Sequence, residues 1–118
     1  MLGRLVNRAL REAPPEFVWG DVLPLLRAAD LRFCNLECVV SDRIPERLPA
    51  KAFHFRSDAK NVAALSAAGM DVVSCANNHS LDYGTEAMLD MIRLLDATGT
   101  YCDTTRLESG VRVQRENN

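Results

Sequence analysis

The chain has 118 residues, of which 47% are apolar and 25% are charged, and its formal net charge is -2. It is therefore the size of one domain, has enough apolar residues to bury a core, and lacks the Gly, Pro or Ser runs that mark disorder. The near-neutral charge and an aromatic content of 6% offer neither a basic face nor a base-stacking platform, so we expect no nucleic-acid binding. No apolar stretch reaches the roughly 20 residues that cross a bilayer, and Arg4, Arg8 and Arg11 interrupt the first residues, so the sequence as given predicts neither a membrane segment nor a secretory signal. Taken literally this favours the cytoplasm, while a cell-envelope location stays open for a longer form of the chain.

The first half of the chain is predicted to contain two short helices and a strand. Residues 4–12 have apolar side chains at helical spacing. A second helix is expected over residues 22–29, with Gly20-Asp21 as its start signal, and Pro24 is tolerated there because it falls in the first turn. Residues 31–36 read as a buried strand that ends at Glu37. Residues 39–52, with two prolines among charges, are predicted to be a loop, and the alternating residues 53–56 to be a short edge strand.

The second half alternates strands and helices. Ser57 is expected to cap a helix over residues 58–68 that Gly69 ends, and residues 70–75 are predicted to form a second strand. A helix with apolar residues at three- and four-residue steps begins at Thr85 and ends at Gly99, and residues 100–102 begin a third strand. This order predicts an α/β fold built from parallel β-α-β units over residues 1–103. Residues 104–118 form a polar tail whose weak strand signal is limited to Val111 and Val113.

Polar side chains follow the two predicted strands at the point where each strand ends. Asn35 and Glu37 lie at the end of the first, and Asn77, Asn78, His79 and Asp82 follow the second. Parallel neighbours would bring these ends to one edge of the sheet, where ligands gather in open α/β folds. A carboxylate, an amide oxygen and an imidazole can share Mn²⁺, Fe or Zn²⁺, and a histidine beside such an ion can donate a proton to a leaving group.

Each of these residues also has a structural interpretation. Paired asparagines at a strand end are a common turn signal, and His79 fits an ordinary loop histidine. Asp82 fits the N-cap of the following helix, a role that is compatible with orienting His79. His54, in an aromatic extended segment, is expected to be partly buried rather than a ligand. The glycosylation pattern at residues 78–80 is a weak signal.

The four cysteines show no Cys-x-x-Cys spacing. Three of them lie in or beside predicted strands, which favours buried thiols that pack as small hydrophobes over a zinc site. A disulfide between Cys34 and Cys75 requires neighbouring strands and an oxidising compartment.

Six segments occur in the order seen in the poly-gamma-glutamate capsule synthesis (CapA-like) family, and together they cover most of the chain up to Gly99. The segments are residues 1–4 (Met-Leu-Gly-Arg), residues 29–31 with 35–37, residues 51–56 (Lys-Ala-Phe-His-Phe-Arg), residues 68–74, residues 76–79 (Ala-Asn-Asn-His) and residues 82–84 (Asp-Tyr-Gly). The chain thus resembles the N-terminal portion of that family. The family is similar to the calcineurin-like metallophosphoesterases, which implies a partial αββα sandwich with metal ions at the strand ends.

The resemblance implies roles for individual residues. Glu37 and Asn78 match metal ligands, His79 matches the acid or phosphate-contacting histidine, Asp82 would orient the loop, and Asn35 and Asn77 would support the site. The implied function is a metal-dependent phosphoesterase-like hydrolase acting on a cell-surface polymer or a phosphoester in capsule synthesis.

The family pattern also includes parts that this sequence does not contain. A Gly-Asp strand end before the Met-Leu-Gly-Arg segment and a downstream Gly-His motif are expected to supply further ligands. We therefore expect a truncated site with doubtful metal binding by the chain alone. The alternative is an inactive remnant that persists as a folded or dimerising binding module, with self-association through an exposed part of the sheet.

Overall fold

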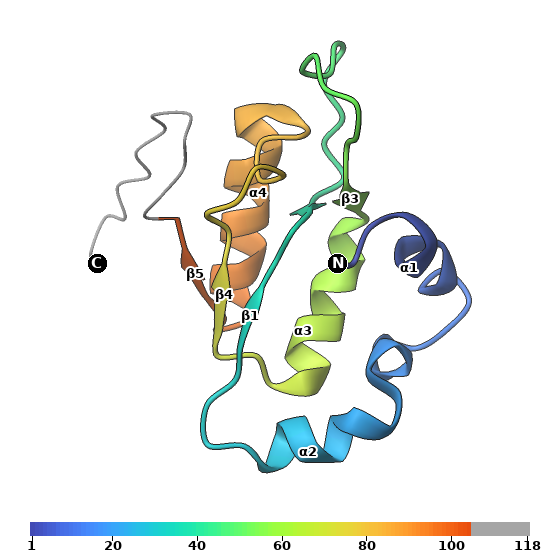
Figure 1. The fold of residues 1–118 in the computed structure, drawn as a ribbon, viewed down its shortest axis with the longest axis vertical. Helices are drawn as coiled ribbons and strands as arrows, with labels where there is room; N and C mark the ends of the chain where they lie inside the picture. The colour runs from blue at the N-terminus through green and yellow to red at the C-terminus, as the bar shows by residue number, and fades with distance from the viewer. Residues whose placement is uncertain (105–118) are drawn as a thin grey trace.

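The computed structural model describes residues 1–104 and confirms the expected α/β class (Figure 1). In chain order the elements are α1 (Arg4–Ala9), the 3-10 helix η1 (Pro15–Val22), α2 (Leu23–Ala28), β1 (Phe33–Asn35), β2 (Val39–Val40), β3 (Arg56–Ser57), the 3-10 helix η2 (Ala59–Asn61), α3 (Val62–Ala68), β4 (Val72–Ser74), α4 (Gly84–Ala97) and β5 (Tyr101–Asp103). The predicted alternation of strands and helices is therefore present. Val111 and Val113, with their weak strand signal, lie outside the described residues.

The strands form two small parallel sheets. The larger has the order β1-β4-β5, and Asn35 of β1 is paired with Ser74 of β4. The smaller consists of β2 and β3. Helix α4 connects β4 to β5 and packs against both β5 and β2 (Figure 1). The parallel β-α-β connection predicted from the sequence is confirmed.

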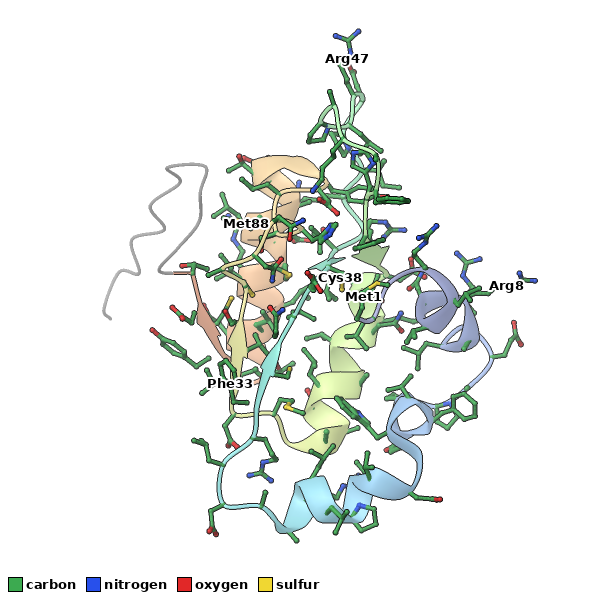
Figure 2. The ribbon with its side chains drawn as sticks, in the orientation of Figure 1. Met1, Arg8, Phe33, Cys38, Arg47 and Met88 are labelled. Carbon is green, nitrogen blue, oxygen red and sulfur yellow. The ribbon has the colours of Figure 1, made fainter. Side chains whose placement is uncertain are left out.

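The two faces of the larger sheet differ in burial. Val73 at the centre of β4 is fully buried, whereas Phe33 of β1 and Tyr101 of β5, both in register with Val72, are 62% and 51% exposed. The expectation of a buried first strand was therefore wrong. The reason is that β1 lies at the edge of the sheet and its outer face has no covering layer within residues 1–104 (Figure 2).

Helix α4 supplies much of the core. Met88, Met91 and Leu95 recur at three- and four-residue steps and are completely buried, as the apolar spacing predicted (Figure 2). The chain leaves the helix at Gly99, whose φ of 76° lies in the left-handed region that glycine adopts without strain. The prediction for this helix is confirmed.

The capping role expected of Ser57 was wrong. Its hydroxyl donates to Asn7 Oδ1 at 3.0 Å and accepts from Asn61 Nδ2 at 2.9 Å, which joins α1 to the start of α3. Asp58 occupies the N-cap position of η2, without a side-chain cap hydrogen bond. The other end of this helical segment is as predicted, because Gly69 ends α3 with φ of 68°.

The segment between β1 and α3 contains structure that the sequence did not predict. Val39 and Val40 form a buried strand inside the expected loop, and β3 starts only at Arg56. The carbonyl of Phe55 nevertheless accepts from the backbone N–H of Val39 at 3.0 Å, so the contact with β2 begins one residue before β3. The connection between β2 and β3 protrudes from the molecule, with Arg47 at its tip (Figure 2).

Two further observations concern the helices. The unpredicted helix η1 is anchored by Trp19, whose indole N–H donates to the carbonyl of Ala64 at 2.7 Å. Over residues 1–104, the structure contains no helix with the length and apolar character needed to cross a membrane.

Candidate functional site

The ends of β1 and β4 lie side by side, as the parallel reading of the sequence predicted. Leu36, the residue after β1, donates its backbone N–H to the carbonyl of Ser74 at 2.9 Å. The carboxyl ends of the two strands therefore open toward the same edge of the sheet. Glu37 follows one end, and the loop from Asn77 follows the other.

Asn77 fastens this loop to β1. Its side-chain N–H₂ group donates to Asn35 Oδ1 and to the carbonyl of Leu36, both at 3.0 Å. Its Oδ1 accepts from the backbone N–H of His79 at 3.0 Å, the local turn geometry that asparagine favours. Asn77 thus forms the predicted turn and also brings the two strand ends together.

His79 is held by Asp82. Its Nδ1 lies 2.7 Å from Oδ2 of Asp82, which is completely buried and also accepts from Lys51 Nζ and from the backbone N–H of Phe55 at 2.6 Å. Burial raises the pKa of Asp82, but the hydrogen bonds from Lys51, His79 and Phe55 outweigh it and lower the pKa. Asp82 is therefore ionised at neutral pH and can only accept, so Nδ1 of His79 carries the shared proton.

The capping role considered for Asp82 was wrong. Helix α4 starts at Gly84 with Tyr83 at its N-cap position and without a side-chain cap hydrogen bond. Both carboxylate oxygens of Asp82 are committed elsewhere, one to Lys51 and the other to Phe55 and His79. The orienting contact with His79 is what the structure contains.

Two neighbours of His79 were missed by the sequence analysis. The ring of Phe55 lies 4.2 Å from the imidazole, centroid to centroid, and Lys51 donates to the carbonyl of Asn78 at 2.6 Å as well as to Asp82. Both residues belong to the segment 51–56 that carries part of the family resemblance, which was the available signal. His54, in the same segment, is half-buried as expected, with its Nε2 2.8 Å from the carbonyl of Pro49.

Glu37 and Asn78 each follow a residue that joins the two strand ends. Glu37 follows Leu36, and Asn78 follows Asn77. Glu37 is half-buried and forms no hydrogen bond or ion pair with any residue in 1–104, and Asn78 is exposed with its side-chain amide similarly uncommitted in that range. The ligand roles predicted for them stay predictions. Carboxylate and amide oxygen atoms are donor types that a divalent cation takes.

The described residues contain no complete set of metal-ligating side chains. Across the described part of the chain, no group of three or more His, Cys, Asp or Glu side chains is arranged to hold a metal ion. A site closed by this chain's own acidic, imidazole or thiol groups is therefore not formed within residues 1–104. What the residues do form is a fixed imidazole with two uncommitted oxygen donors on the adjoining segments.

The cysteines pack differently from the pairing that was considered. Cys75 Sγ lies 2.6 Å from Cys102 Sγ, and neither Cys34 nor Cys75 forms a disulfide. The adjacent thiol of Cys102 and burial raise the pKa of Cys75, so its thiol is protonated at neutral pH. Cys75 therefore packs as a small buried hydrophobe, as the sequence favoured.

Most of the chain matches a family of known proteins. Residues 1–102 match the family described as bacterial capsule synthesis protein PGA_cap. The chain belongs to this family. The match spans all the described elements up to β5 and includes every candidate site residue.

The relatives that this chain matches are considerably longer than the chain itself. The chain is 37% identical over 101 residues to the protein y4uA of Sinorhizobium fredii (strain NBRC 101917 / NGR234), with 80% of this chain and 21% of the relative covered. It is 28% identical over 92 residues to the PGA biosynthesis protein CapA of Bacillus subtilis (strain 168), covering 78% and 24%. It is 30% identical over 95 residues to the capsule biosynthesis protein CapA of Bacillus anthracis, covering 79% and 23%. The matched part of the chain thus spans about a fifth to a quarter of these relatives.

Proposed function

We propose that this PGA_cap chain contributes part of a metal-dependent phosphoesterase-like site that serves the synthesis of capsule or a γ-linked glutamate polymer. The observation that carries the proposal is the contact between His79 and the buried, ionised Asp82 at the joined ends of β1 and β4. The names of two Bacillus relatives, a PGA and a capsule biosynthesis protein, support the biological setting.

The chemistry proposed for this chain's own residues centres on one proton. With Nδ1 bound to Asp82, His79 keeps Nε2 for the substrate, and Nε2 has no hydrogen-bond partner among the described residues. In its protonated form, His79 would donate from Nε2 to the leaving-group oxygen as the phosphoester bond breaks. Asp82 would hold the ring in position and stabilise its positive charge.

A divalent cation, Mn²⁺, Fe or Zn²⁺, is part of this proposal. Glu37 and Asn78 would provide oxygen ligands, and the ion would polarise a phosphoryl oxygen. Because residues 1–104 do not form a complete shell, the remaining ligands would come from outside them and binding by the described residues alone would be weak.

The test is Mn²⁺-dependent hydrolysis of bis(p-nitrophenyl) phosphate by the chain and its variants. His79→Ala should lower the rate by about 100-fold, the typical contribution of a general acid. His54→Ala is the matched control, because it removes the other histidine without touching the His79–Asp82 pair. A rate that His79→Ala leaves unchanged would count against the hydrolase proposal.

A second candidate is a catalytically inactive module that acts by binding or self-association. It is favoured by the incomplete set of metal-capable side chains in the described residues and by the exposed Phe33 and Tyr101 on one sheet face. Sedimentation velocity with and without Mn²⁺ separates the candidates. A metal-independent species with no hydrolytic rate would support the inactive module.

A further inference from the structure

Two of the segments that carry the family resemblance, residues 1–4 and residues 51–56, meet close to His79. Arg4, from the first segment, places its guanidinium carbon 5.9 Å from the ring centroid of Phe53 and 5.6 Å from that of Phe55. Phe55 is the residue whose ring lies 4.2 Å from the imidazole of His79. One aromatic ring is therefore the common neighbour of a cation and of the proposed acid.

The backbone at Arg4 is held in an unusual conformation. Its φ of 54° lies in the left-handed region, and it is the one non-glycine residue with positive φ in the part of the chain that the structure describes. Such strain persists only where surrounding contacts enforce it, and it concentrates at binding and catalytic sites. Gly3 fixes the approach, since a Cβ there would meet the carbonyl of Arg56 at 3.1 Å.

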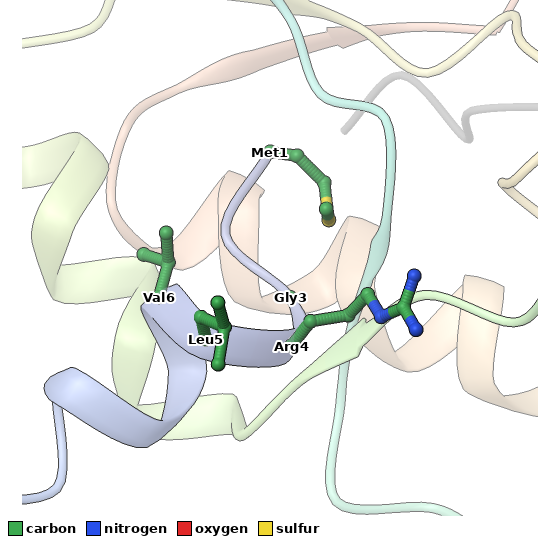
Figure 3. A pocket seen from close by; sticks show the side chains of 5 residues that line it. All are labelled: Met1, Gly3, Arg4, Leu5 and Val6. Carbon is green, nitrogen blue, oxygen red and sulfur yellow. The ribbon is translucent and has the colours of Figure 1, made fainter.

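Arg4 also borders an apolar pocket at the start of the chain. That pocket, of about 550 Å³, is lined by Met1, Gly3, Arg4, Leu5 and Val6. Figure 3 shows the Arg4 side chain extending to the opposite side from Leu5 and Val6. The guanidinium carbon of Arg4 lies over the rings of Phe53 and Phe55.

The guanidinium of Arg4 has no ion-pair or hydrogen-bond partner among the described residues, unlike two other cationic side chains near it. Within residues 1–104, Arg4 forms no ion pair or hydrogen bond, whereas Lys51 is bound to Asp82 and Arg56 to Asp58. A contact with aromatic faces uses none of the five N–H donors of arginine, which lie in the plane of the guanidinium and stay free for an oxyanion. Phosphate and carboxylate are the groups that this fork geometry fits.

We propose that Arg4, held over Phe53 and Phe55, binds an oxyanionic group, phosphate or carboxylate, of the molecule on which His79 acts. The proposal rests on the proposed function for the identity of the reacting group, but the anion contact can be measured without hydrolysis. Arg4 thereby becomes a recognition residue, and Phe53 and Phe55 become the platform that positions it.

The experiment is an NMR titration of the arginine side-chain Nε–Hε signals with two probes, inorganic phosphate and a γ-linked glutamate trimer. The Arg4 signal, identified by its absence in Arg4→Gln, should shift with at least one probe, and the probe that gives the stronger response identifies the oxyanion. Arg4→Gln should raise the apparent dissociation constant, followed on backbone amides of residues 51–56 and 77–79, by about tenfold. Arg8→Gln, which removes an exposed arginine from the same helix, is the matched control and should leave it unchanged (Figure 2).

A second variant guards against misfolding. Arg4→Gly removes the guanidinium while placing at a positive φ the residue that adopts it most readily, so it should fold and still lose binding. Equal loss in the Arg4 and Arg8 variants, or no response of wild-type Arg4 to either probe, would overturn the proposal. His79→Ala should lower the hydrolysis rate by about 100-fold but retain the Arg4 response, so failure of the hydrolase proposal remains distinguishable from failure of this one.

Discussion

Asn77 donates its side-chain amide to Asn35 Oδ1 at 3.0 Å and so joins the loop after β4 to the end of β1. The same amide donates to the carbonyl of Leu36, and its oxygen accepts from the backbone of His79. One asparagine therefore fixes the position of the loop that carries Asn78 and His79 relative to the strand that precedes Glu37.

Replacing Asn77 should destabilise the fold more than replacing its neighbour. Asn77→Ala removes four side-chain hydrogen bonds and leaves the carbonyl of Leu36 without this donor, so the free energy of unfolding should fall by about 2 kcal/mol. Asn78→Ala is the control, because its exposed side chain is uncommitted and should change stability by no more than about 0.5 kcal/mol. Urea denaturation measures both, and equal effects would contradict the structural role of Asn77.

Asp82 should be essential for stability as well as for orientation. Asp82→Asn keeps the shape but removes the charge that accepts from Lys51, from Phe55 and from His79 inside the protein. Breaking one partner of such a buried pair typically costs about 3 kcal/mol of unfolding free energy. Asp21→Asn, at an exposed position in η1, should cost less than about 0.5 kcal/mol.

The pair Arg32 and Asp71 should make stability pH-dependent. Arg32 donates to Asp71 Oδ2 through Nε at 2.9 Å and through its backbone N–H at 2.8 Å, and these bonds lower the pKa of Asp71. A lowered folded-state pKa stabilises the protein above the ordinary aspartate pKa, and this contribution is lost as the pH falls through the folded-state value.

Arg32→Met should therefore raise the pKa of Asp71 toward its ordinary value, as followed by the carboxyl ¹³C shift. It should also reduce the loss of stability between pH 6 and acidic pH, because less pH-linked stabilisation remains to be lost. An Asp71 titration curve that is identical in both proteins would refute the pairing.

The face of the larger sheet on which Phe33 and Tyr101 are exposed should mediate self-association. Phe33 is 62% exposed and in register with Val72, whose other partner Tyr101 is 51% exposed, which makes an apolar row across three strands. Phe33→Lys should shift the sedimentation coefficient toward the monomer. Leu25→Lys, at an exposed apolar position on α2, is the control and should leave it unchanged. A wild-type protein that stays monomeric at high concentration would contradict this expectation.

Local patterns in the sequence, such as helical apolar spacing and a glycine at a helix end, correctly predicted helix α4 and the end of helix α3. The three- and four-residue steps of Met88, Met91 and Leu95 gave α4 correctly, and Gly69 marked the end of α3. The burial of β1 was not predictable in this way, because an apolar run does not reveal whether a strand lies at the centre or the edge of its sheet. Phe33 is apolar and yet exposed for that reason.

The same distinction applies to the candidate site, where some contacts were predictable from the sequence and others were not. The convergence of Asn35 with Asn77 followed from two parallel strands, which the alternation of elements indicated. The contacts of Asp82 with Lys51 and Phe55 could not be predicted in this way, because these two residues lie 31 and 27 positions earlier in the chain. Only the fold of the protruding segment between β2 and β3 brings them to the loop, and no local spacing encodes that path.

The central claim is that Glu37 and the Asn78–His79 segment face one shared site. Paramagnetic broadening by Mn²⁺ in ¹H–¹⁵N spectra tests it directly, because the effect detects even weak binding at short range. The account predicts that the amide signals of Glu37, Asn78 and His79 broaden together at the same Mn²⁺ concentration, and that Glu37→Gln abolishes the broadening at Asn78 and His79 too. Broadening confined to one strand end, or broadening at Asn78 that persists unchanged in Glu37→Gln, would contradict it.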